Sequence, residues 1–94
     1  VVQMICVLLD KLAPNFLDNI GSFQELILFT TDRPGHDQRY AINPSKITQK
    51  LDWSPKESFE SGIHKTVQWY LNNQQWWSRI LKDTYQGQRL GLMK

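Results

Sequence analysis

The spacing of apolar residues divides the chain into amphipathic helices and one continuous apolar run. The first amphipathic segment covers residues 1–12 and stops before Pro14 and Asn15, which disfavour a helix. No capping residue precedes it, so the pattern predicts that the chain opens inside a helix and that its apolar face needs a partner surface. That face consists of Val1, Ile5, Leu8, Leu9 and Leu12.

Residues 25–30 have a different pattern, in which four large apolar side chains follow one another without a polar interruption. The run is Glu25, Leu26, Ile27, Leu28, Phe29 and Thr30. Such a run is too continuous for a strand with one face in water. It predicts a short strand that is buried or lies beside a sheet edge.

A polar loop follows over residues 30–40, with a turn predicted at Pro34 and Gly35. A short helix is then expected at about residues 44–51. Asn43 would be its N-cap and Pro44 its first residue, with Ile42 packed on Ile47 and Leu51 continuing a buried stripe.

Two further helices are predicted in the second half of the chain. The longer one begins near Ser58, although Ser54 and Glu57 form a rival capping box. Its buried face is Phe59, Ile63, Val67, Tyr70 and Leu71. The last helix covers about residues 74–82 and carries Trp76, Trp77, Ile80 and Leu81, and residues 84–94 are expected to form a loose tail.

Composition limits the chain to one domain at most. Ninety-four residues, of which 40% are hydrophobic, bury roughly 60–65% of their unfolded surface. No apolar run is long enough for a membrane span and no secretory leader is present, so we expect a cytosolic protein. The single cysteine and two histidines exclude disulfide and structural zinc scaffolds.

The charge balance narrows the choice of ligand. A net charge of +2 is too low for a nucleic-acid partner, whereas a short anionic ligand fits. Arg33, His36 and Arg39 supply charge-assisted donors on the polar loop, and Gly35 allows close approach. The alternative is that both arginines pair with Asp32 and Asp37 and leave a solvated, self-cancelling loop.

Other candidate residues favour structural roles. The chain has no glycine-rich dinucleotide fingerprint, no Tyr-x-x-x-Lys pair and no paired carboxylates in an apolar setting, so no catalytic set is visible. His64 is interpreted as a surface residue and Cys6 as a small core or interface residue. Trp69, Tyr70, Trp76 and Trp77 are expected to pack in a core or an interface rather than to stack on a ligand.

Several runs carry a family resemblance. They are residues 32–42, beginning Asp32, Arg33, Pro34, Gly35, His36 and Asp37, together with residues 45–47, 51–55, 59–71 and 85–92. The chain resembles the carboxy-terminal part of the dTDP-glucose 4,6-dehydratases, which are extended short-chain dehydrogenases/reductases. The resemblance implies an α/β enzyme with an NAD-binding Rossmann domain, to which this chain would add a mostly helical substrate-binding part with one or two short strands.

That family converts dTDP-glucose to dTDP-4-dehydro-6-deoxyglucose and water, for rhamnose and related surface sugars. The resemblance implies that Asp32, Arg33, Pro34, Gly35 and His36 belong to the dTDP-sugar pocket. Arg33 would grip the diphosphate, His36 would donate nearby, and Asp32 would orient Arg33. Gln38 departs from the family pattern, which has a second basic residue there.

The resemblance also implies that the Rossmann domain, its NAD and the catalytic residues lie upstream of residues 1–94. We therefore expect this chain alone to hold no cofactor, to bind dTDP-sugar weakly or not at all, and to be inactive. Its expected partner is the Rossmann domain of the same enzyme. Two alternatives stay open, namely a fragment of another nucleotide-sugar epimerase or decarboxylase and a non-catalytic helical interaction module.

Overall fold

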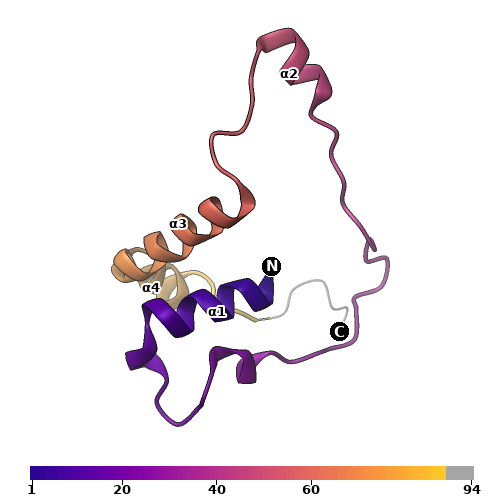
Figure 1. Ribbon diagram of the computed structural model, residues 1–94. Coiled ribbons are helices and arrows are strands. Elements are labelled where there is room, and N and C mark those ends of the chain that lie inside the picture. Colours follow the sequence, from indigo (N-terminus) through magenta and orange to yellow (C-terminus); the bar gives the residue numbers. More distant parts are fainter. Residues whose placement is uncertain (89–94) are drawn as a thin grey trace.

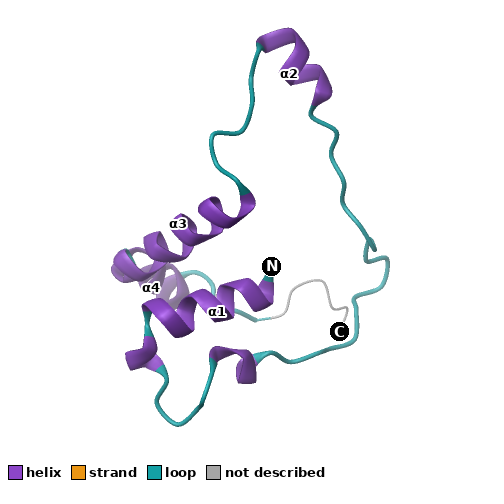
Figure 2. Ribbon diagram, viewed as in Figure 1, coloured by secondary structure: helices purple, strands orange, loops and turns teal. Residues whose placement is uncertain are grey.

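The computed structural model describes residues 1–88, and the regular structure in them is entirely helical (Figure 2). The elements in chain order are α1 (Val2–Leu12), the 3₁₀ turns η1 (Pro14–Phe16) and η2 (Phe23–Leu26), α2 (Ser45–Leu51), α3 (Phe59–Asn72) and α4 (Gln74–Asp83). The predicted, mostly helical character is thus confirmed. None of these helices is long and apolar enough to cross a membrane.

The packed part of the molecule, here called the helical cluster, consists of α1, η1, η2, α3 and α4. Helix α1 packs against both 3₁₀ turns and α3, and α3 packs against α4 (Figure 1). Cys6, Ala13 and Val67 are its buried apolar residues. The buried stripe of α3 is narrower than predicted, because Ile63 and Leu71 are half-buried whereas Phe59 and Tyr70 are exposed. The facing stripes of α1 and α3 therefore make a thin core.

Polar contacts fix the connections around this core. The Ser22 hydroxyl donates to Asp10 Oδ2 at 2.6 Å, and the Phe23 backbone N–H donates to Asp10 Oδ1 at 2.8 Å. Ser22 Oγ also accepts from the Gln24 backbone N–H and so caps η2. At the other end, the Trp77 indole N–H donates to the Tyr70 carbonyl oxygen at 2.8 Å, which links α4 to α3.

The predicted strand at residues 25–30 is wrong for the described part of the chain. Residues 25 and 26 belong to η2, while Ile27 has extended backbone at φ −73° and ψ 120°. Leu28 and Phe29 are 84% and 98% exposed rather than buried. A strand needs a neighbouring strand to satisfy its backbone groups, and residues 1–88 contain none, so the local bonds of the capped 3₁₀ turn prevail.

Helix α2 also differs from its prediction. It begins at Ser45 with Pro44 as N-cap, and the Asn43 side chain accepts from the Ser45 backbone N–H at 3.1 Å. Leu51 is 73% and Ile42 is 92% exposed, so the predicted stripe is not buried and Ile42 is not shielded by Ile47. The physical reason is that no described element packs against α2, so its apolar residues have nothing to be buried against.

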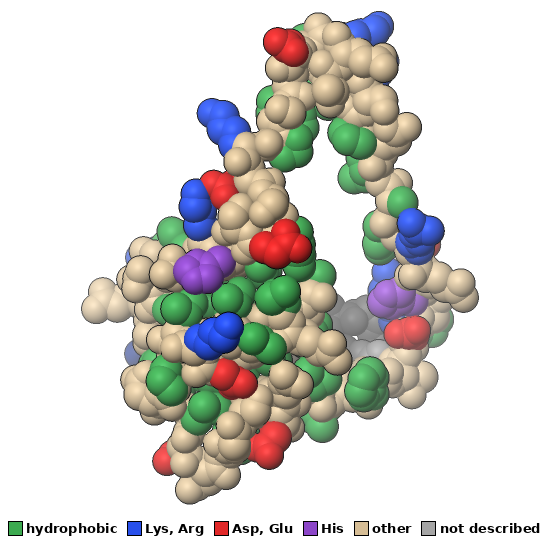
Figure 3. Space-filling view, in the orientation of Figure 1, with side chains coloured by type: hydrophobic (Ala, Val, Ile, Leu, Met, Phe, Trp, Pro, Cys, Tyr) green, Lys and Arg blue, Asp and Glu red, His purple; other side chains and the backbone are tan. Residues whose placement is uncertain are grey.

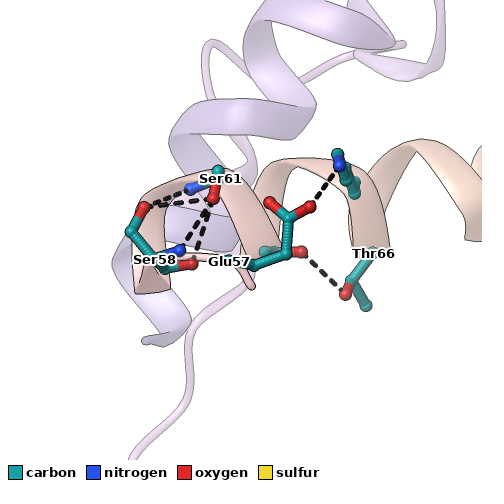
Figure 4. Close-up of polar contacts among 6 residues, drawn as sticks. Glu57, Ser58, Ser61 and Thr66 are labelled. Carbon is teal, nitrogen blue, oxygen red and sulfur yellow. Dashed lines mark hydrogen bonds and ion pairs between the residues drawn. The ribbon is translucent and has the colours of Figure 1, made fainter. Parts of the chain in front are cut away.

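The start of α3 decides between the two capping boxes. Ser58 is the N-cap: its Oγ accepts from the Ser61 backbone N–H at 3.1 Å, and its own N–H donates to Ser61 Oγ at 3.0 Å (Figure 4). The Glu57 carboxylate accepts a hydrogen bond from the Lys65 ammonium, which lowers the pKa of Glu57 below its ordinary value.

The C-terminal end of the described chain agrees closely with its prediction. Helix α4 ends at Asp83, one residue beyond its predicted end. The tail predicted at 84–94 lies outside the described residues from residue 89 onward.

Residues 27–57, here called the arm, carry α2 away from the helical cluster on two long connections (Figure 1). The space-filling view shows open space between the two parts (Figure 3). The radius of gyration is 17.4 Å, against about 12 Å for a compact chain of this length. The accessible surface is 8878 Å², against about 5,700 Å² for a folded monomer of this mass. The chain is thus far more open than a compact domain.

Candidate functional site

The candidate site is the polar loop of the arm, and a tight turn shapes it. The His36 backbone N–H donates to the Arg33 carbonyl oxygen at 3.2 Å, so residues 33–36 form the predicted turn. Gly35 has φ +71°, which suits the third position of a type II turn, and Pro34 suits the second. A Cβ at Gly35 would meet nothing within 4 Å, so the turn requires glycine for its backbone angle rather than for space.

The carboxylates of the loop are not paired with its arginines. Asp32 Oδ1 lies 3.9 Å from His36 Nδ1, within ion-pair distance when the imidazole is protonated. Asp37 Oδ2 accepts a hydrogen bond of 2.8 Å from the Tyr40 hydroxyl. Within residues 1–88 neither Arg33 nor Arg39 forms an ion pair, so the self-cancelling arrangement does not form. We expected Asp32 to orient Arg33, but the Asp32 carboxylate lies nearest to the His36 imidazole instead.

Tyr40 adds to the residues that the sequence predicts for this loop. Its hydrogen bond to Asp37 raises the pKa of the phenol, because losing the proton would leave two negative charges side by side, and slight desolvation acts in the same direction. The sequence could have indicated this contact only through the spacing of Asp37 and Tyr40, which lie three positions apart in the loop. The bond braces the second half of the loop, as the turn braces the first.

All five predicted site residues, Asp32, Arg33, Pro34, Gly35 and His36, are exposed. The turn brings the backbones of Arg33 and His36 together, and within residues 1–88 the guanidinium of Arg33 forms no hydrogen bond or ion pair. A guanidinium binds two oxygens of a phosphate at once, and an imidazole N–H adds a directional donor. The loop can therefore form one side of an anion site, while the other sides must come from elsewhere.

The described residues do not fit a dinucleotide cofactor. A dinucleotide cradle needs a strand, a glycine-rich turn and a helix whose N-terminus faces the pyrophosphate. The two glycines with positive φ among residues 1–88 are Gly35 and Gly87, and neither leads directly into a helix. No group of three or more His, Cys, Asp and Glu side chains in this part of the chain could hold a metal ion.

The remaining candidates lie in the helical cluster, away from the loop. Cys6 is a free, buried thiol, as predicted, whereas His64 is half-buried. The rings of Trp69 and Trp76 meet edge to face at 5.3 Å, but both side chains stay exposed. Trp77 alone combines partial burial with a hydrogen-bonded indole. The aromatic group thus packs within the cluster without filling a core.

Comparison with known proteins places the chain in a family. The family model for GDP-mannose 4,6 dehydratase matches residues 17–66, which include the whole loop. A dTDP-glucose 4,6-dehydratase of Escherichia coli is 53% identical over all 94 residues, and one of Neisseria meningitidis is 50% identical over the same length. A probable dTDP-glucose 4,6-dehydratase of Sinorhizobium fredii is 48% identical. No solved structure matches the chain.

Each of these three relatives is matched along the full chain but over only 26% of its own length. The chain thus spans about a quarter of the relatives, in their C-terminal part. The resemblance to the dTDP-glucose 4,6-dehydratases that the loop predicts is confirmed. Since the family model covers more than half of the residues, the chain belongs to the GDP-mannose 4,6 dehydratase family.

Proposed function

We propose that the chain supplies the C-terminal, substrate-binding part of a dTDP-glucose 4,6-dehydratase, an enzyme that converts dTDP-glucose to dTDP-4-dehydro-6-deoxyglucose and water. The observation that carries the proposal is the exposed turn at residues 33–36, where the Arg33 guanidinium has no ion-pair partner within residues 1–88. The identity of about 50% to dTDP-glucose 4,6-dehydratases along all 94 residues supports the choice of sugar nucleotide.

Each loop residue has a part in this proposal. Arg33 binds the diphosphate of dTDP-glucose through two parallel N–H donors, and His36 donates to the same region. Asp32 positions the His36 ring, since their side chains lie within 3.9 Å. Pro34 and Gly35 hold the turn. The side chains of Arg33 and His36, rather than overall charge, thus select the phosphate. Residues 1–39 carry five acidic and only three basic side chains, so this part of the chain has a net negative charge.

The rest of the pocket belongs, in this proposal, to the part of such an enzyme that these residues do not span. That part would hold NAD in a Rossmann domain and carry the catalytic residues, and it is the partner that this chain needs. The 94 residues alone are not expected to turn over substrate. We place the enzyme in the cytoplasm, where activated nucleotide sugars are made.

A chimera tests the proposal directly. In it, these 94 residues replace the aligned part of the E. coli relative, and the purified chimera is assayed with dTDP-glucose, GDP-mannose and a UDP-sugar. Conversion of dTDP-glucose alone supports the proposal. Conversion of GDP-mannose would instead favour the activity for which the matching family model is named, and preference for the UDP-sugar would favour another nucleotide-sugar enzyme.

The role of Arg33 is tested in the same chimera. Replacing Arg33→Gln removes a charged hydrogen-bond donor pair, so we expect dTDP to bind more weakly by about 1.5–3 kcal/mol, roughly 10- to 150-fold in Kd. Arg79→Gln, on exposed α4, is the matched control and should leave the affinity unchanged. Isothermal titration calorimetry measures both. An unchanged Kd for Arg33→Gln would exclude the assigned contact.

A separate titration addresses the non-catalytic alternative. Amide chemical shifts of the 94-residue chain are followed while dTDP is added. Saturable shifts confined to residues 31–40 indicate that the loop retains nucleotide affinity by itself. Shifts in α1 and α3 that need an added protein, with none caused by dTDP, would indicate an interaction module instead.

A further inference from the structure

The loop at residues 32–40 holds fixed charges of both signs in equal number. It carries two aspartates and two arginines, and His36 adds an imidazole. All of these side chains are exposed, and Figure 3 shows acidic, basic and histidine side chains gathered on this stretch of the arm. Such a composition works against anion binding, because a guanidinium that pairs with a carboxylate no longer offers its donors to a ligand.

Asp37 is well placed in the sequence to pair with an arginine. It lies four positions after Arg33 and two before Arg39. The Asp37 carboxylate nevertheless accepts from the Tyr40 hydroxyl at 2.8 Å, and within residues 1–88 it forms no ion pair. A neutral phenol thus occupies this carboxylate in place of an arginine.

The preference for the phenol has a physical reason. An exposed ion pair between flexible side chains contributes little to stability. A hydrogen bond to a carboxylate contributes more, and a tyrosine has only two side-chain angles to fix, whereas an arginine loses far more rotamer freedom. The bond also raises the pKa of the Tyr40 phenol, so the hydroxyl remains a donor well above neutral pH.

The other carboxylate of the loop is also away from the arginines. Asp32 Oδ1 lies 3.9 Å from His36 Nδ1. Both carboxylates thus lie against groups other than guanidiniums, and neither Arg33 nor Arg39 forms an ion pair among the described residues. This arrangement leaves two planar, charged donor groups for a ligand that presents several phosphate oxygens.

We propose that Tyr40 is a positioning residue of the anion loop, whose hydroxyl holds the Asp37 carboxylate away from Arg33 and Arg39 and so keeps both guanidiniums available to the phosphates of a nucleoside diphosphate sugar. This inference rests on the proposed function, because that function supplies the phosphate-bearing ligand. It adds Arg39 to the phosphate-binding side chains. It also gives Tyr40 a role that requires no contact with the ligand.

Two single variants and their combination test the proposal in the chimera described above. Tyr40→Phe frees Asp37 to pair with an arginine, so we expect the Kd of dTDP to rise roughly 2- to 5-fold, the factor that corresponds to one surface ion pair. Asp37→Asn removes the competing charge, so adding Tyr40→Phe to it should change the Kd by less than about 1.5-fold. Tyr70→Phe is the matched control, since the Tyr70 hydroxyl makes no hydrogen bond within residues 1–88.

The comparison of the two backgrounds excludes other roles for Tyr40. A direct contact with the ligand, or a purely mechanical brace, predicts the same loss with and without Asp37→Asn, because an amide oxygen still accepts from the hydroxyl. Equal losses would therefore overturn the proposal, and so would the absence of any loss in Tyr40→Phe. In steady-state assays Tyr40→Phe should raise the KM for dTDP-glucose and leave kcat unchanged. A lower kcat at an unchanged KM would contradict a role in binding.

A second measurement needs neither turnover nor the chimera. Nuclear magnetic resonance of the 94-residue chain follows the guanidinium Nε signals of Arg33 and Arg39. In Tyr40→Phe at least one of these signals should shift as the Asp37 carboxylate comes into contact, and Asp37→Asn should move it back. Unchanged arginine signals in Tyr40→Phe would overturn the proposal, even for a chimera that does not fold.

The outcomes also separate this inference from the proposed function. A chimera that does not convert dTDP-glucose, but in which Tyr40→Phe weakens dTDP binding only while Asp37 is present, keeps the positioning role and rejects the function. Conversion of dTDP-glucose with equal losses in both backgrounds keeps the function and rejects the positioning role.

Discussion

The helical cluster and the arm both carry large apolar side chains, but among the described residues only the cluster contains buried apolar residues. In the cluster, α1 packs against α3 and both 3₁₀ turns, and Cys6, Ala13 and Val67 are buried there. In the arm, the seven-residue helix α2 has an apolar side but no neighbour, so Ile47 and Leu51 stay exposed. An amphipathic pattern is thus enough to form a helix, whereas burial of its apolar side requires a second element that packs against that side.

The largest expected effect comes from breaking the core of the cluster. Val67→Asp buries an unpaired carboxylate between α1 and α3, which should cost about 3 kcal/mol or more, comparable with the whole stability of so small a chain. Leu51→Asp, in the arm, places the same group in water and should change stability by less than about 0.5 kcal/mol. Urea unfolding followed by circular dichroism at 222 nm compares them. Equal effects would show that the cluster has no core of its own.

The next effect concerns the polar tie between α1 and η2. Asp10→Ala removes the acceptor of the Ser22 hydroxyl and the Phe23 N–H, both partly buried, so we expect a loss of about 1–3 kcal/mol. Asp18→Ala is the matched control, since that carboxylate makes no hydrogen bond within residues 1–88. The same unfolding measurement applies. A loss no greater than that of the control would mean that η2 is held by apolar packing alone.

A smaller effect is expected where the arm joins the cluster. Ser58→Ala breaks the capping box at the start of α3 and should cost about 1 kcal/mol. Ser78→Ala, inside exposed α4, should be neutral or slightly stabilising. Amide exchange in the first turn of α3 should accelerate in Ser58→Ala while that of α1 does not. Uniform acceleration in both helices would contradict a local role for the cap.

The smallest effect lies wholly within the arm. The hydrogen bond to Asp37 raises the pKa of Tyr40, so its stabilising effect is complete below the ordinary tyrosine pKa of 10.0 and is lost as the pH rises through the raised value. Asp37→Ala should lower the pKa of Tyr40 toward 10.0 and leave the helices intact. Asp32→Ala should not move it. Nuclear magnetic resonance of labelled Tyr40 follows the titration, and an unshifted pKa in Asp37→Ala would show that the bond does not persist in solution.

The sequence predicts those parts of the fold that depend on neighbours along the chain. The four helices, the Pro34–Gly35 turn and the Ser58 cap are all set by residues within one or two turns of each other. The strand at residues 25–30 and the buried side of α2 depend on partners distant in the chain, and among residues 1–88 these partners are missing. Periodicity reports which side of an element is apolar, but it carries no information about what covers that side.

The candidate site divides in the same way. The five loop residues could be named from their types and from the family resemblance, and the turn that joins Arg33 to His36 follows from Pro34 and Gly35. Which carboxylate meets which donor could not be predicted, since Asp32 and Asp37 each had several donors within reach. The pairing of Asp37 with Tyr40 depends on the course of the backbone between them.

Gly35 has one further consequence, which concerns handedness. Its φ of +71° is strained for an L-residue, yet there is open space where a side chain would be. The position therefore discriminates by chirality and not by size. D-alanine favours positive φ, so a chain made by chemical ligation with D-alanine at this position should keep the turn and restrict the loop before a ligand arrives, whereas L-alanine should loosen it. A comparison of the glycine, D-alanine and L-alanine chains would thus show how much of the order of the loop the turn at Gly35 provides in the free chain.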